Sequence, residues 1–375
     1  MPDGLADNSK PAAVPARDHY ARLLEEAAAI KGVSLWKDAG RRLRKNLAAM
    51  ASILLLTLVG LISWLVPVLP LQSPKQQDLQ RQYMGPTWKS VALDLGDVSD
   101  AEAFASRVDQ LWHKPGWFDT SLIRLRLWLF GQRCIPSICG TDNLGRDLLS
   151  RIVWGSRVSL LVGVVATLVS LVIGVTYGAT AGYLGGWVDN AMMRFVDVLY
   201  SVPFIFVVIF LITVLNQEDI KRELARYGIN KIVIFFIVIG AIYWLTMARI
   251  VRGQVISLKN EQFIEAARTI GAGRARIIFR HLVPNLLSVV IVYLTLTIPS
   301  VMLFEAFLSF LGLGVEPPDV SWGMLANEGI KSISPLQTHW WLVVFPGLAL
   351  ALTLYALNFL GDGLRDALDP RLKNR

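Results

Sequence analysis

The chain has 375 residues, of which 54% are hydrophobic and 18% are charged, and its formal net charge is +8. Soluble domains are about 45–50% apolar, and here the apolar residues gather in long runs almost free of charge, which excludes an ordinary soluble domain. The basic residues flank those runs, a pattern typical of membrane orientation rather than of nucleic-acid binding. With two cysteines and four histidines that lack the H-E-x-x-H spacing, the sequence predicts neither a disulfide scaffold nor a metal site.

Residues 1–47 are expected to form a cytoplasmic N-terminal segment. Its polar and charged composition excludes a cleaved signal peptide, so the first apolar run should be a retained anchor. Trp36, Ala39, Leu43 and Leu47 recur at helical spacing among basic residues. This spacing fits an amphipathic helix on the cytoplasmic membrane face, and it equally fits a plain extension of the first span.

Six apolar runs predict an all-α integral membrane protein with six transmembrane helices. A span needs about 20 apolar residues, because the hydrocarbon core is about 30 Å thick. The runs are Ala48–Leu69, Val158–Ala181, Tyr200–Leu215, Ile232–Ala248, Leu286–Leu313 and Trp340–Leu360. The third and fourth runs are short and could be tilted or shielded. The expected divisions are a first span over 48–70, an outer segment over 71–157, a five-helix core over 158–362 and a tail over 363–375.

The distribution of lysine and arginine orients these spans. Basic residues cluster before the first span, between the fourth and fifth spans, and after the sixth, whereas the opposite short loops are poorer in them. Both termini are therefore expected in the cytoplasm of a multi-pass membrane protein. The segment 71–157 falls on the outer side, and its length predicts a small ordered cap rather than a bare loop.

The stretch 260–284 carries the most specific pattern on the cytoplasmic side. Asn260 is a candidate N-cap, and Gly271 is a natural helix stop in the left-handed conformation. The helix between them is expected to present one apolar face, made of Phe263, Ala266, Ala267 and Ile270. A second helix should run from about Arg274 to Leu282 and end at Pro284. Such a small apolar knob suits docking into a groove of another protein.

These residues carry a resemblance to a known family. Glu265-Ala266-Ala267, then Gly271, then His281-Leu282-Val283-Pro284 resembles the EAA loop of ABC importer permeases. His281 stands where the wider family has Ile, as in its peptide and nickel branch. Further blocks in the right order are Gly140–Asp147, Gly182–Asp189, Leu308–Gly314 and Gly361–Pro370. Ser34–Ala39 and Met247–Gln254 are most similar to the C-type subunit of oligopeptide permeases, and the resemblance covers about residues 34–70 and 140–375.

The resemblance implies a type I ABC importer permease fold, with an enlarged periplasmic segment between the first two helices. It implies a second, B-type permease subunit, two ATPase subunits and a periplasmic peptide-binding protein as partners, beside the lipid bilayer. The chain has no G-x-x-x-x-G-K-[ST] phosphate loop, so ATP and Mg²⁺ are expected on the ATPase subunits and no cofactor is expected here. The implied ATPase-coupling residues are Phe263, Glu265, Ala266, Ala267, Gly271 and Pro284.

Other candidate sites follow from position and chemistry. Glu305 is the only acid inside a span, so it either lines the pathway or makes a structural hydrogen bond. Asp142, Arg146 and Asp147 either help to dock the binding protein or pair among themselves. Cys134 and Cys139 are expected on the oxidising side and are predicted to form a disulfide. The glycines at 174, 178 and 182 either pack within this chain or contact the partner permease.

Three alternative functions remain to be distinguished from an oligopeptide permease. The same architecture could import dipeptides, nickel chelates or a peptide antibiotic instead of oligopeptides. An intramembrane enzyme would need paired polar groups inside the spans, and only Glu305 qualifies. A channel would need rings of filter groups and would leave the docking loop without a purpose. The sequence therefore favours a translocation subunit without enzymatic activity of its own.

Overall fold

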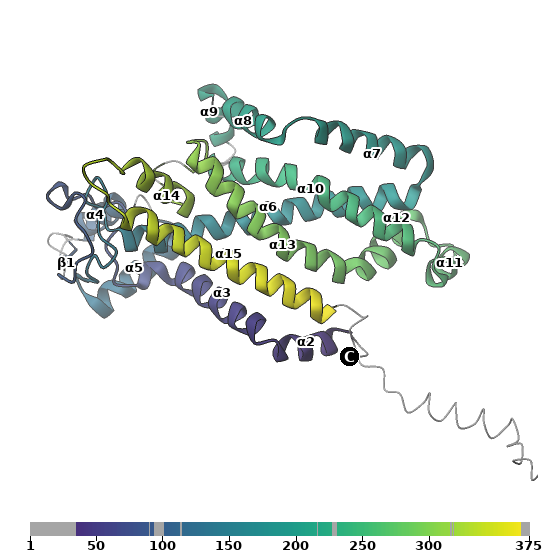
Figure 1. Cartoon of the computed structure of the whole chain (residues 1–375), viewed down its shortest axis with the longest axis horizontal. Coiled ribbons are helices and arrows are strands. Elements are labelled where there is room, and N and C mark those ends of the chain that lie inside the picture. Colours follow the sequence, from purple (N-terminus) through teal and green to yellow (C-terminus); the bar gives the residue numbers. More distant parts are fainter. Residues whose placement is uncertain are drawn as a thin grey trace, which may run out of the picture.

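The computed structural model describes residues 35–89, 91–93, 101–112, 115–215, 217–226, 231–315, 317 and 319–368. Within them the chain forms an elongated bundle of long helices with a smaller cap at one end (Figure 1). The long helices are α3 (Leu47–Leu65), α6 (Leu148–Leu184), α10 (Lys231–Leu258), α13 (Val283–Phe310) and α15 (Trp341–Leu368). The shorter ones are α2 (Leu35–Lys45), α4 (Ala101–Trp112), α5 (Trp117–Phe130), α7 (Gly186–Ser201), α8 (Phe204–Leu215), α9 (Glu218–Arg226), α11 (Gln262–Thr269), α12 (Arg274–Arg276) and α14 (Trp322–Lys331).

Five helical segments are long and apolar enough to cross a membrane. They are Leu47–Val68, Leu148–Leu184, Val233–Leu258, Arg274–Phe310 and Trp341–Leu368. Helices α7 and α8 make up a sixth span if the bent pair is counted as one. The predicted all-α membrane architecture is thus confirmed, with one span broken.

The third span is broken where a continuous run over Tyr200–Leu215 was expected. Helices α7 and α8 meet at an angle of 84°. Proline disfavours the helical conformation in the residue before it, and Val202, which precedes Pro203, is extended at φ −85° and ψ 127°. The 12 residues of α8 reach about 18 Å, which is less than the hydrocarbon thickness of about 30 Å.

The small residues of α6 bring α10 close to it. The backbone of α10 near Trp244, Ala248 and Arg252 lies against Gly174, Gly178 and Gly182, one turn after another. Because no Cβ separates the two backbones, the helices approach closely along their length. This arrangement confirms that the glycine stripe packs within the chain. It also extends the fourth span beyond the run predicted from Ile232 to Ala248.

The fifth span begins earlier than expected and continues through a proline. A π-helical turn, η3 (Ile277–Leu282), joins α12 to α13, so Pro284 lies in the first turn of α13 instead of ending a helix. In this wider turn the Val283 N–H donates to the Ile278 carbonyl. The side-chain amide of Asn285 donates to the carbonyl of His281 at 2.6 Å. The predicted helix end at Pro284 is therefore wrong, because the π turn accommodates the missing N–H.

Helix α2 is separate from the first span. Asn46 is extended between α2 and α3, and its side chain accepts a hydrogen bond from Ala49 N–H at 3.1 Å as the N-cap of α3. Ala39 is buried, and α2 contacts the end of α15, where Leu43 lies near Gly363. Of the two alternatives, the plain extension of span one is excluded.

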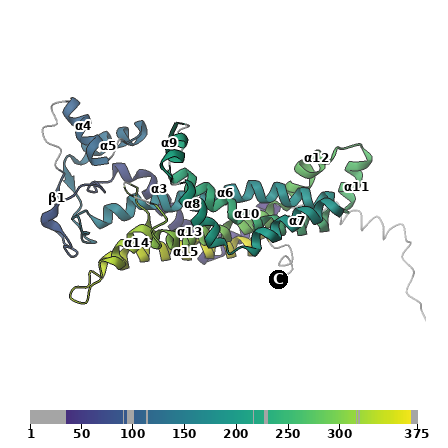
Figure 2. The same cartoon turned by 90° about the horizontal axis from the view of Figure 1, so that it is seen from above.

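The cap is built from the segment between α3 and α6 together with α14. Short 3₁₀ turns, η1 (Val66–Val68) and η2 (Leu79–Arg81), lead into it. Its two strands, β1 (Val91–Ala92) and β2 (Arg133–Cys134), pair antiparallel. They lie on an apolar cluster made by Leu93, Val108, Trp112, Ile123 and Cys134. The cap and α11 lie at opposite ends of the long helices (Figures 1 and 2).

Candidate coupling surface and outer charge network

Helix α11 ends at the predicted glycine corner. Gly271 has φ +87°, a conformation that other residues adopt only with strain. Its N–H donates to the Arg268 carbonyl at 2.9 Å, and the next N–H, of Ala272, donates to the Ala267 carbonyl at 3.0 Å. This is the paired hydrogen-bond pattern that closes a helix at a left-handed glycine. The N-terminus differs from expectation, because Glu261 and not Asn260 occupies the N-cap position.

The exposed apolar side of α11 is narrower than the sequence suggested. Phe263 is 39% exposed and Ile270 87% exposed, and Ala266 lies between them on the same side. Ile264 and Ala267 are buried at 0% and 8% exposure, toward the chain itself. The expectation that Ala267 belongs to the docking face is therefore wrong. Periodicity identified the apolar positions but could not tell which of them pack against the turn that follows.

Arg268 and the ion pairs nearby hold α11 and the broken span in place. The Arg268 guanidinium lies 5.4 Å from the centre of the Tyr183 ring at the end of α6. At the same end of the bundle, Arg252 of α10 donates to both carboxylate oxygens of Asp189 of α7, at 2.6 and 2.7 Å. These contacts connect α6, α7 and α10 at the end of the bundle that carries α11.

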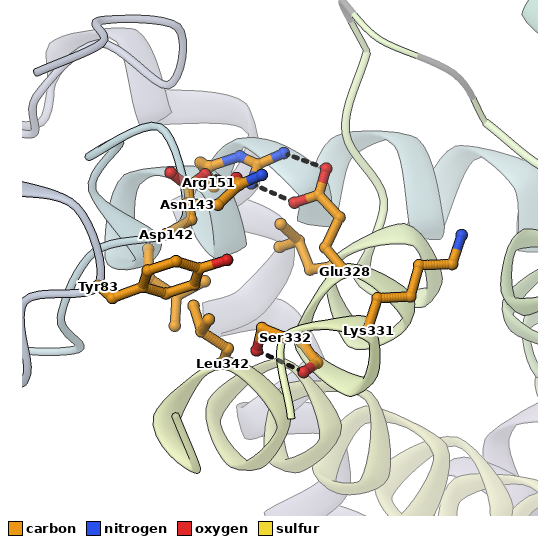
Figure 3. A pocket seen from close by; sticks show the side chains of 11 residues that line it. Tyr83, Asp142, Asn143, Arg151, Glu328, Lys331, Ser332 and Leu342 are labelled. Carbon is orange, nitrogen blue, oxygen red and sulfur yellow. Dashed lines mark hydrogen bonds and ion pairs between the residues drawn. The ribbon is translucent and has the colours of Figure 1, made fainter. Parts of the chain in front are cut away.

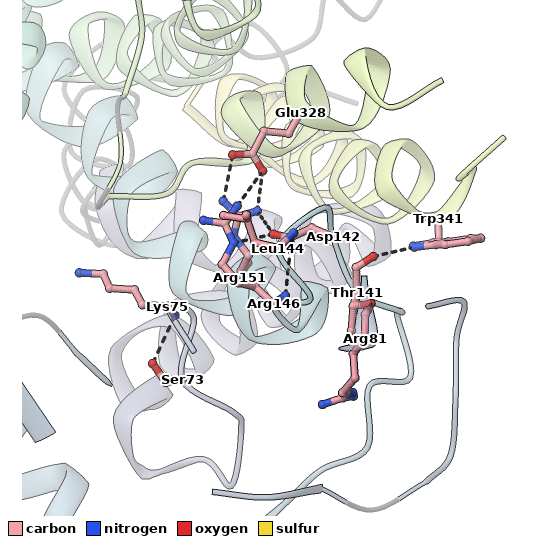
Figure 4. Close-up of polar contacts among 10 residues, drawn as sticks. All are labelled: Ser73, Lys75, Arg81, Thr141, Asp142, Leu144, Arg146, Arg151, Glu328 and Trp341. Carbon is pink, nitrogen blue, oxygen red and sulfur yellow. Dashed lines mark hydrogen bonds and ion pairs between the residues drawn. The ribbon is translucent and has the colours of Figure 1, made fainter. Parts of the chain in front are cut away.

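At the opposite end, four charged side chains form an outer charge network, defined as Asp142, Arg146, Arg151 and Glu328 (Figure 4). The Nη1 atom of Arg151 lies 2.6 Å from Asp142 Oδ2 and 2.5 Å from Glu328 Oε2. Arg146 Nε approaches Asp142 Oδ2 at 2.7 Å. The network joins the loop before α6, the first turn of α6 and helix α14.

This geometry favours internal pairing over docking for the residues proposed from sequence. Asp142 and Asp147 are both 2% exposed. Asp147 caps α6 by accepting hydrogen bonds from the Ser150 N–H at 2.8 Å and hydroxyl at 2.7 Å. Of the three residues proposed from sequence, only Arg146 reaches the surface, with its side chain 13% exposed. The pairing of Arg151 with Glu328 could not be predicted, because the two residues are 177 residues apart.

A small cavity of about 160 Å³ adjoins the network (Figure 3). Its walls include Tyr83, Asn143, Lys331 and Leu342. Tyr83 has φ +50°, rare for a residue with a side chain, and its ring stacks on that of His339 at 4.1 Å between centres. The strained loop is thus fixed against the segment that enters α15.

Glu305 makes structural hydrogen bonds. It is 1% exposed on α13, and its Oε1 accepts hydrogen bonds from the hydroxyls of Ser309 and Ser321, both at 2.7 Å. Ser321 is also the N-cap of α14. The carboxylate therefore anchors α14 to the fifth span, as the structural alternative predicted.

The predicted disulfide is absent, since both cysteines are free thiols. Cys134 packs in the cluster under β1, whereas Cys139 packs against Leu148 and Leu325 in a second cluster. The turn through Pro136 directs the two side chains into different clusters. Arg126 donates to Cys134 Sγ at 3.2 Å. Burial raises the pKa of both thiols, that of Cys139 to about 11.

Thiol labelling checks this correction. In native protein at pH 7, we expect neither cysteine to react with a maleimide, because both thiols are buried and a raised pKa keeps them protonated. After denaturation without reductant, both should react. Labelling of neither cysteine until a reductant is added would instead establish the bridge.

Two family patterns match this chain. The pattern of the binding-protein-dependent transport system inner membrane component matches residues 170–374. The pattern of the N-terminal transmembrane domain of oligopeptide transport permease C matches residues 34–86. The chain belongs to the family of binding-protein-dependent inner membrane components and is a membrane permease subunit of an ABC importer.

Individual relatives show which branch of the family this chain resembles. The dipeptide transport system permease protein of Bacillus subtilis is 39% identical over 93% of this chain and 90% of its own length. Oligopeptide transport system permease proteins of Haemophilus influenzae and Escherichia coli are 39% and 41% identical, each over 91% of this chain and 90% or 93% of their own length. The expected resemblance to oligopeptide and dipeptide permeases is confirmed.

Proposed function

We propose that this chain forms, with a second permease subunit, the passage for oligopeptides that a periplasmic binding protein delivers. The observation that carries the proposal is the exposed apolar strip of α11, made of Phe263, Ala266 and Ile270, beside a rigid glycine corner. An apolar strip on an otherwise charged end of a membrane protein suits a partner-protein groove. In this proposal one of two separate ATPase subunits binds there, and ATP is hydrolysed by those subunits alone.

The termini and α11 lie on the cytoplasmic side in this proposal, and the cap lies in the periplasm. The support is the excess of lysine and arginine around α2, α11 and the tail. ATPase closure at α11 would move the bundle through the ion-paired contacts of α7 and α10. The names of the relatives support a peptide cargo. The spans hold few polar groups, so selectivity is assigned to the binding protein.

Ala266→Glu tests the coupling role. The variant chain should fold and insert, because Ala266 is exposed, but the ATPase subunits should no longer copurify and uptake of peptide should fall to background. An unpaired charge placed in a dry contact costs several kcal/mol. Copurification of the subunits with the tagged chain, and uptake of labelled peptide into cells, are the measurements.

Two matched variants complete the experiment. Thr269→Glu adds the same charge at an exposed position outside the apolar strip and should leave the ATPase subunits bound. Ala267→Glu places the charge in the chain's own interior and should lower its thermal stability instead. Normal copurification and normal uptake in Ala266→Glu would refute the coupling role. The ligand that copurifies with the co-encoded binding protein would separate oligopeptides from dipeptides, nickel chelates or a peptide antibiotic.

A further inference from the structure

Helix α5, in the segment expected to be an aqueous cap, carries an exposed aromatic face. Trp117 and Trp128 are 84% and 80% exposed and lie on one side of the helix with Arg124 and Leu125. On the other side, Ile123 is completely buried in the cap. Two exposed tryptophans on one helix face are unusual for a surface that meets only water.

The first turn of α5 is fixed at the level where the first span ends. Arg157 of α6 donates to both carboxylate oxygens of Asp119 at 2.9 and 3.0 Å. The same guanidinium donates to the backbone carbonyls of Ser63 at 2.8 Å and Trp64 at 2.9 Å. These carbonyls belong to the last turn of α3, so α5 begins at the outer boundary of the membrane span.

An apolar groove connects α5 with the sides of the spans. It measures about 530 Å³ and is lined by residues of three helices, among them Gly60 and Trp64 of α3, Phe118 of α5, and Leu161 and Val164 of α6. The rings of Trp64 and Phe118 are 5.2 Å apart. Leu161 and Val164 are exposed on the side of a helix long and apolar enough to cross the membrane. The groove therefore opens onto the exposed apolar side of α6.

We infer that α5 lies in the headgroup layer of the membrane, where it covers a phospholipid whose acyl chain occupies this groove. Tryptophan prefers the membrane–water interface because its ring is apolar and its N–H is polar. Arg124 lies on the same exposed face and suits a lipid phosphate. In Figure 2, α4 and α5 stand to one side of the long helices at their outer end, as a helix resting on lipid requires.

Quenching by brominated lipid tests the inference. The full chain, with the subunits that copurify, is placed in nanodiscs of phosphatidylcholine and phosphatidylglycerol, brominated high on the acyl chain or unbrominated. The difference in emission between wild type and the Trp117→Phe/Trp128→Phe variant isolates these two residues. Most of that difference should disappear in brominated lipid, because bromine quenches only rings that it contacts.

Trp88→Phe is the matched control, since Trp88 is 83% exposed but lies three residues before β1, at the end of the cap. Its difference emission should not respond to bromine. If the emission of Trp117 and Trp128 is equally strong in both lipids, the face is covered by protein or water and the inference is wrong. If the double variant does not fold, each single variant still isolates the emission of one of the two tryptophans, so the test can still be made.

Discussion

Gly178→Ala should lower the thermal stability and the yield of the assembled chain, whereas Gly347→Ala should leave both unchanged or raise them. Both glycines lie inside long helices, and alanine favours helix over glycine by about 1 kcal/mol at each. A Cβ atom at Gly178 would overlap the carbonyl oxygen of Ala248, which belongs to the backbone of α10. At Gly347 the same atom would meet open space.

The physical cause is the close contact between α6 and α10. A backbone carbonyl cannot rotate away as a side chain can, so the two helices must separate, and overpacking costs about 1–3 kcal/mol or more. Separation would also move Arg252 away from Asp189 and loosen the end of the bundle that carries α11. Uptake should therefore fall together with stability.

Thermal unfolding in detergent, followed by size-exclusion chromatography, measures the first effect, and peptide uptake measures the second. Equal midpoints for the two alanine variants would mean that α6 and α10 are not held by this glycine contact. A partial rescue of Gly178→Ala is not expected from Ala248→Gly, because the overlapping atom belongs to the backbone.

Part of this architecture could be predicted from the sequence because lipid imposes simple rules. Apolar length located the spans, and the glycine at 271 located the end of α11, since a left-handed corner favours that residue. The break in the third span was harder to predict. The uncharged run from Tyr200 to Leu215 continues across Val202, and only Pro203 indicated a bend.

Whether an apolar residue of α11 is exposed or buried could not be predicted, because the exposed and buried faces of the helix are both apolar and adjoin. Ala266 and Ala267 are neighbours of one size, yet one is exposed and the other is buried. The partner of Arg151 could not be predicted for another reason. No local spacing connects it with Glu328, because the contact forms only after α14 folds back on α6.

Arg151→Ala should destabilise the chain strongly, and it should do so more than Arg226→Ala. Arg151 is completely buried and contacts Asp142, which is 2% exposed, so its loss leaves a buried carboxylate with Arg146 as the remaining partner. Breaking a buried ion pair costs about 3–5 kcal/mol. The pair of Arg226 and Glu223 is exposed on α9, where such a contact contributes about 0–1 kcal/mol.

A double variant distinguishes the effect of losing the ion pair from the effect of losing side-chain volume. Asp142→Asn keeps the acceptor oxygen that binds the Leu144 and Arg146 N–H groups, both at 2.9 Å, but removes the charge. Arg151→Ala combined with Asp142→Asn should therefore lose less stability than the sum of the two single variants. Additive losses in thermal unfolding midpoints would show that Arg151 acts by filling space. A coupled result would mean that the charge itself holds the loop before α6 against α14, at the end of the bundle opposite α11.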